Sequence, residues 1–190
     1  MENRMTRNVM ALKKSQRARD RVSEEIALEH IQEFFVEKKV QEVEKEGERM
    51  TVSLEAINPK RNLMKDFRSL FTRTKIFRGE YKSKLVKLAS TIMEMSVTPD
   101  LALILQVIVM RGPFLDEKKT GFQVALVEVK RGNAEMSSYQ KKDVEIAKNR
   151  HIPYYLLRID DSNFMDGKFL LKLEPLTPSL LLTVSKVVNT

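Results

Sequence analysis

The sequence predicts an α/β protein in which a mixed central β-sheet is flanked by helices. Residues 20–46 favour a long helix, because apolar residues recur there at helical spacing. Residues 101–110 and 121–130 are β-branched apolar runs with a turn between them, which favours an antiparallel hairpin. Residues 137–149 favour another helix and residues 153–159 a further strand, so helices and strands alternate.

The elements before the hairpin follow from pattern and from breakers. Residues 20–46 contain neither glycine nor proline, so nothing interrupts the opening helix. Residues 50–57 alternate polar and apolar side chains and end at Asn58-Pro59, as expected of a half-buried strand. Residues 60–95 are rich in Lys, Leu and Met, and predict a helical insertion of one or two helices.

The later elements are marked by turns and caps. Gly112 and Pro113 lie in the stretch that separates the two hairpin strands. Ser137 and Gln140 have the spacing of a capping box and mark the start of the following helix. Residues 161–190 form a C-terminal elaboration with a turn at Asp166-Gly167. We therefore expect one domain over residues 1–190, with residues 1–19 as a basic N-terminal extension.

Composition limits the chemistry that the chain can perform. The 190 residues are 42% hydrophobic and 32% charged, which is enough apolar material for one sizeable core. The chain has no cysteine, and its two histidines, His30 and His151, have no ligand spacing, which argues against a zinc site. Any bound metal is therefore expected on carboxylates.

The location of the protein is predicted from two absences in the sequence. The first twenty residues are charged where a secretory signal needs an apolar stretch. The longest apolar run, residues 101–110, is about half the length of a spanning helix. We expect a cytoplasmic protein without membrane contact, in the host cytoplasm if a virus encodes it.

The net charge of +8 is concentrated in two segments. Residues 1–21 hold seven basic and two acidic residues, and residues 60–87 hold ten basic and two acidic residues. Such segments fit a polyanion such as DNA, because each neutralised phosphate releases counterions, although solvated helix faces would look the same. The predicted nucleic-acid-binding residues are Arg4, Arg7, Lys13, Lys14, Arg17, Arg19, Arg73, Lys75 and Arg78.

The hairpin brings three charged residues to one end of the sheet. If its turn centres near Leu115, Asp100 at the start of one strand lies beside Glu128 and Lys130 at the end of the other. Glu128 and Lys130 are two residues apart and so point to the same face. Two neighbouring carboxylates favour a cation between them, and Mg²⁺ or Mn²⁺ bound there would activate a water and polarise a phosphate. Lys130 would orient the attacking water or stabilise the charge that develops on the phosphate.

Pro99-Asp100, a strand, a turn and then Glu128-Val129-Lys130 resemble the PD-(D/E)XK signature of restriction-endonuclease-like nucleases. The chain looks most similar to archaeal Holliday-junction resolvases and related viral nucleases, over about residues 20–160. The resemblance implies an α-β-β-β-α-β core, Mg²⁺-dependent hydrolysis of DNA, including branched DNA such as Holliday junctions, and a homodimer. The stretch between the first strand and Pro99 is longer than in compact members.

The resemblance also implies two further catalytic residues. A glutamine on the second helix of the core often lies near the catalytic lysine, which fits Gln140, although the capping box with Ser137 is an alternative role. The opening helix often supplies an acidic metal ligand. At 100° per residue Glu24 falls on the apolar face while Glu25 and Glu29 point to solvent, so Glu24 is the predicted ligand unless the helix frays there.

Two other functions compete with a nuclease. The first is a nucleic-acid-binding protein that retains the fold and uses its carboxylates structurally. The second is a basic helical adaptor for acidic proteins, in which the strand motif is coincidental. The presence of Asp100, Glu128 and Lys130 together favours the enzyme, because a lapsed site tolerates the loss of any one of them.

Overall fold

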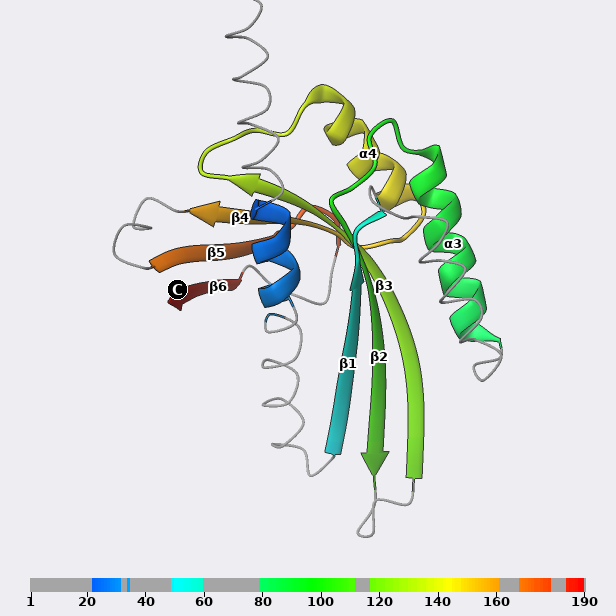
Figure 1. The fold of residues 1–190 in the computed structure, drawn as a ribbon. Helices are drawn as coiled ribbons and strands as arrows, with labels where there is room; N and C mark the ends of the chain where they lie inside the picture. The colour runs from blue at the N-terminus through cyan, green and yellow to red at the C-terminus, as the bar shows by residue number, and fades with distance from the viewer. Residues whose placement is uncertain are drawn as a thin grey trace, which may run out of the picture.

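The computed structural model describes residues 22–31, 34, 49–59, 79–111, 117–160, 168–178 and 184–189. Within these residues, six strands form one sheet and follow one another in chain order (Figure 1). The strands are β1 (Arg49–Ile57), β2 (Leu101–Arg111), β3 (Glu117–Arg131), β4 (Tyr154–Asp160), β5 (Lys168–Pro175) and β6 (Val184–Asn189). The helices are α3 (Glu80–Glu94), α4 (Ser138–Asn149) and an opening helix over residues 22–31, with residue 34 also helical.

The sheet is mixed because of one parallel step. β3 and β4 run parallel, whereas all other neighbouring strands are antiparallel. Parallel neighbours need a long crossover, and α4 supplies it between β3 and β4. The predicted α/β layout, with a mixed sheet and flanking helices, is confirmed at this level.

The β2–β3 hairpin forms as predicted, with its register centred one residue earlier than Leu115. Leu101 pairs with Val127, so the next position, Asp100, lies opposite Glu128 rather than opposite Lys130. Moving the centre by one residue shifts the pairing by two positions. Because side chains alternate with a period of two, this shift leaves every side chain on its predicted face.

The two faces of the sheet carry different cores. On one face, the opening helix packs Ala27, Ile31 and Phe34 against residues such as Leu103 and Val127. On the other face, α3 and α4 cover a second cluster, and both helices lie together on one side of the sheet in Figure 1. That cluster comprises Ile57, Tyr81, Leu85, Leu88, Ile92, Ala102, Ile104, Val124, Leu126, Ala147, Ile152 and Tyr154.

Local signals at both ends of α4 account for its bounds. At its start, the Ser137 hydroxyl accepts from the Gln140 N–H at 3.2 Å, and the Gln140 Oε1 accepts from the Ser137 N–H at 2.9 Å. At its end, His151 has a φ of 53° in the left-handed region, and its N–H donates to the Lys148 carbonyl at 2.9 Å. This reversal turns the chain into β4, and it gives His151 a structural position on an exposed corner.

Several expectations lie wholly or partly outside the described residues. The predicted opening helix is described only at 22–31 and 34, and the insertion only from residue 79 onward, where α3 forms. All nine predicted nucleic-acid-binding residues, from Arg4 to Arg78, lie outside, as does the turn at Asp166-Gly167. None of the helices in the described part combines the length and apolar character that a membrane crossing requires.

Candidate active site

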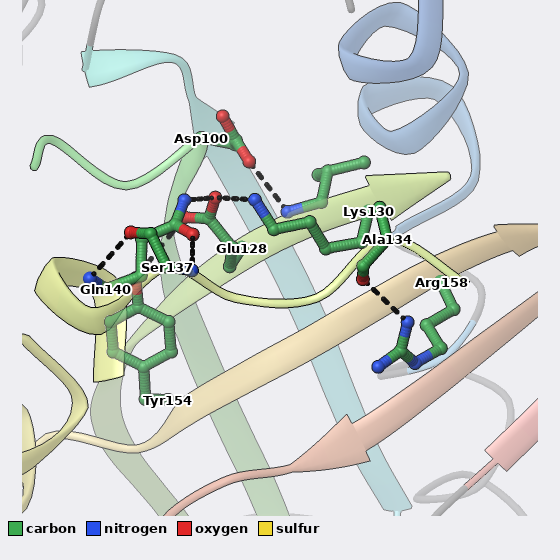
Figure 2. A network of polar contacts seen from close by, with 9 residues as sticks. Asp100, Glu128, Lys130, Ala134, Ser137, Gln140, Tyr154 and Arg158 are labelled. Carbon is green, nitrogen blue, oxygen red and sulfur yellow. Dashed lines mark hydrogen bonds and ion pairs between the residues drawn. The ribbon is translucent and has the colours of Figure 1, made fainter. Parts of the chain in front are cut away.

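Asp100 and Glu128 meet across the β2–β3 hairpin, on the face that α3 and α4 cover (Figure 2). Their exposed fractions are 4% and 2%, so both carboxylates are buried. The backbone N–H of Val129 donates to the Asp100 Oδ2 at 2.7 Å. This bond holds the Asp100 carboxylate against the end of β3, one residue from Glu128.

Lys130 joins the two carboxylates from the same strand as Glu128. Its Nζ lies 3.0 Å from the Glu128 Oε1, and its side chain is 17% exposed. The spacing of two residues along β3 puts both side chains on one face. The structure thus brings Asp100, Glu128 and Lys130 together. The two acids are buried, and the Lys130 amine beside them is partly accessible to solvent.

The side-chain amide of Gln140 connects α4 to the Glu128 carboxylate. Its Oε1 completes the capping box with Ser137, while its Nε2 donates to the Glu128 Oε1. The two roles that the sequence presents as alternatives are therefore compatible, because one amide carries both an acceptor and a donor. The capping box fixes the orientation in which the donor faces Glu128.

Tyr154 is a member of the site that the sequence analysis places only within the strand expected over residues 153–159. It is buried at the start of β4, and its hydroxyl lies 3.5 Å from the Glu128 Oε2. Burial raises the pKa of Tyr154 well above its ordinary value, and the negative charges of Glu128, Asp100 and Asp143 raise it further. The hydroxyl therefore stays protonated and remains a donor toward Glu128.

Asp143 is a buried carboxylate that the sequence analysis did not single out. Its exposed fraction is 0%, and its two oxygens accept from the N–H groups of Ser96 at 2.8 Å and Val97 at 2.9 Å. These residues belong to the segment that leads from α3 to Asp100. One signal was available: Asp143 follows Gln140 by three residues, so both occupy the same face of the helix.

Glu24 lies on the inward side of the opening helix, as its helical phase predicts. It is half-buried, and the Asn58 Nδ2 donates to its Oε2 at 2.7 Å, whereas Glu25 and Glu29 are exposed. Across the described part of the chain, no three His, Cys, Asp or Glu side chains gather as a metal-binding group. Glu24 is thus not brought together with Asp100 and Glu128 into the predicted set of three ligands.

Among the described residues of the site, buried carboxylates outnumber amines. Asp100, Glu128 and Asp143 supply three buried carboxylates, while Lys130 contributes the amine beside Glu128. The Asp143 carboxylate accepts from two backbone N–H groups. The pair Asp100 and Glu128 is a set of oxygen donors that suits a hard divalent cation such as Mg²⁺, which needs only one or two carboxylates besides water and phosphate.

Comparison of the chain with protein-family models, with curated proteins and with solved structures found no match.

Proposed function

We propose that the protein is a metal-dependent nuclease of the PD-(D/E)XK kind that hydrolyses phosphodiester bonds in DNA. One observation carries this proposal: two residues with buried carboxylates, Asp100 and Glu128, lie at opposite positions at the end of a hairpin, with the Lys130 amine 3.0 Å from Glu128. With α3 inserted between β1 and β2, the order opening helix, β1, β2, β3, α4, β4 is consistent with the α-β-β-β-α-β core of these enzymes. Branched DNA is the proposed preferred substrate and a homodimer the proposed active form.

Asp100 and Glu128 are the residues that would hold the Mg²⁺ or Mn²⁺ ion. When bound, such an ion lowers the pKa of a coordinated water and polarises the phosphate that the water attacks. The protein side chains supply the rest. Lys130 presents a positive charge for the phosphate oxygens of the transition state, and Gln140 and Tyr154 hold the Glu128 carboxylate in place through its two oxygens.

The direct test is incubation of the purified protein with linear, circular, single-stranded and four-way-junction DNA, each with Mg²⁺, Mn²⁺ or EDTA. We expect cleavage with either metal and none with EDTA, with the junction cut fastest. Binding of DNA without cleavage under every condition would favour the alternative of a non-catalytic DNA-binding protein. Absence of both binding and cleavage would favour the adaptor for acidic proteins. Sedimentation of the same preparation measures its molecular mass and so tests the homodimer.

Glu24→Gln tests whether the opening helix contributes to catalysis. If Glu24 completes the site, this variant should cleave at least about a hundredfold more slowly without a lower melting temperature, because the neutral amide can still accept from Asn58. Glu25→Gln is the matched control, since that side chain is exposed on the same helix. A larger loss of cleavage in Glu25→Gln would assign the ligand to Glu25 instead.

Gln140→Ala and Ser137→Ala separate the two roles of the Gln140 amide. Both variants break the capping box and should destabilise the protein by about 1 kcal/mol each. Only Gln140→Ala removes the donor to Glu128, so only this variant should slow cleavage, by about tenfold or more. Melting curves measure the stability and initial rates measure the cleavage. Equal cleavage rates in the two variants would show that Gln140 acts only as part of the helix cap.

A further inference from the structure

Arg158 is a cation on the active-site face for which the described part of the chain offers no acidic partner. It is half-buried on β4, and its Nη1 donates to the carbonyls of Gly132 at 3.3 Å and Ala134 at 3.1 Å. Among the described residues, no carboxylate forms an ion pair with it. A guanidinium has five N–H donors, so its Nε and Nη2 groups remain available to another ligand.

The sheet register places Arg158 in line with two lysines. Arg158 pairs with Lys130 across β3 and β4, and with Lys172 across β4 and β5. Paired residues on neighbouring strands point to the same face, and the strands lie about 4.8 Å apart. We call these three residues the cationic row. It begins at the proposed reaction centre and leads away from it across the sheet.

The members of the cationic row differ in what neutralises them. Lys130 pairs with Glu128 at 3.0 Å, and Lys172, which is 45% exposed, pairs with Glu174 at 2.6 Å. Arg158 is instead held by two carbonyls of the loop between β3 and α4. Figure 2 shows its guanidinium beside Ala134, with Lys130 between Arg158 and Gln140. The side chain is therefore oriented in advance but keeps its full charge for an anion.

We propose that Arg158 binds the phosphate next to the one that is cleaved, with Lys172 as the outer cation of the same subsite. The ligand is the phosphodiester backbone of one DNA strand, whose path then crosses β3, β4 and β5 along the cationic row. Arginine suits this role because its planar fork matches two phosphate oxygens, and the loop carbonyls reduce the entropy lost when it binds. This subsite rests on the proposed nuclease function.

Arg158→Gln tests the subsite through the salt dependence of DNA binding. Binding of a fluorescein-labelled oligonucleotide in EDTA, measured over a salt series, should show a slope of log affinity against log salt reduced by about 0.7–0.9, the value of one phosphate contact. Arg150→Gln is the matched control, because Arg150 is the C-cap of α4, pairs with the exposed Glu94 at the end of α3, and loses the same charge when it is substituted. An unchanged slope in Arg158→Gln overturns the proposal.

A chemically altered substrate gives a test that does not depend on how the variant folds. A neutral methylphosphonate replaces the phosphate adjacent to the cleaved bond, and KM and kcat are measured with the wild-type protein. We expect KM to rise about tenfold with kcat nearly unchanged, as for an interaction made equally in ground and transition states. On this substrate Arg158→Gln should have nearly the same KM as the wild-type protein, because the contact is already lost. If the substitution and the methylphosphonate each raise KM by their full factor when combined, Arg158 does not contact that phosphate.

The subsite and the nuclease can fail separately. If the wild-type protein cleaves DNA while Arg158→Gln behaves like Arg150→Gln, the subsite is wrong and the nuclease stands. If the wild-type protein binds DNA without cleaving it and only Arg158→Gln lowers the salt slope, the contact between Arg158 and a DNA phosphate stands, but the nuclease, and with it the position of that phosphate beside a cleaved bond, is wrong. If no DNA is bound, both are wrong.

Discussion

Asp100→Asn, Glu128→Gln and Lys130→Ala should each abolish cleavage, to below about a thousandth of the wild-type rate, because each acts on the metal or on the transition state. The affinity for DNA should stay within about tenfold, since none of the three is proposed to supply the main phosphate contacts. Rates under single-turnover conditions and affinities in EDTA measure the two quantities.

The three variants should differ in their response to metal. Loss of either carboxylate should weaken Mg²⁺ binding, measured by titration calorimetry, whereas Lys130→Ala should leave it largely intact. The Val129 N–H remains paired in Asp100→Asn, because the amide oxygen can accept as the carboxylate does. Wild-type activity in any one variant would remove that residue from the active site.

Asp143→Ala should lower the free energy of unfolding by about 2–5 kcal/mol. The substitution removes the acceptor of two hydrogen bonds, from the N–H groups of the exposed Ser96 and the half-buried Val97. A hydrogen bond to a charged group contributes about 1.5–3 kcal/mol, and an exposed donor loses less because water replaces the acceptor. Because the released segment leads into Asp100, the Mg²⁺ concentration for half-maximal cleavage should rise as well. Urea unfolding and a metal titration of the cleavage rate are the measurements.

Asp143→Asn and Glu145→Ala are the controls for this effect. Asparagine keeps one acceptor but turns a donor toward the second N–H, so its loss of stability should be intermediate. Glu145 is exposed on the same helix and pairs with Lys148 at 3.5 Å, so its removal should change stability by less than about 0.5 kcal/mol. Equal stability of Asp143→Ala and Glu145→Ala would show that the 96–97 backbone does not depend on α4.

The hairpin and its charged end could be predicted from sequence because the relevant signals are local. Two apolar runs and one turn define β2 and β3, and alternation then assigns Glu128 and Lys130 to one face. An error of one residue in the turn centre preserved those faces. Ser137 and Gln140 marked the start of α4 for the same reason, since a capping box involves only neighbouring residues.

The remaining parts of the site depend on pairings that no local pattern contains. Tyr154 reaches Glu128 only because β4 lies parallel to β3, with Leu126 opposite Tyr154. Asp143 contacts residues 96–97, which are more than forty positions away along the chain. The partner of Glu24, Asn58, looked like a strand terminator, because Asn-Pro is a common end to a strand. In each case the side chain was visible in the sequence but its neighbour was not.

The single parallel step between β3 and β4 makes the connection between these strands part of the site. Parallel neighbours need a long crossover, and α4 is that crossover. The helix that supplies Gln140 therefore also carries the chain to Tyr154, and these two residues follow Glu128 by 12 and 26 positions. A shorter connection between β3 and β4 would cost the site both groups that hold Glu128 in place.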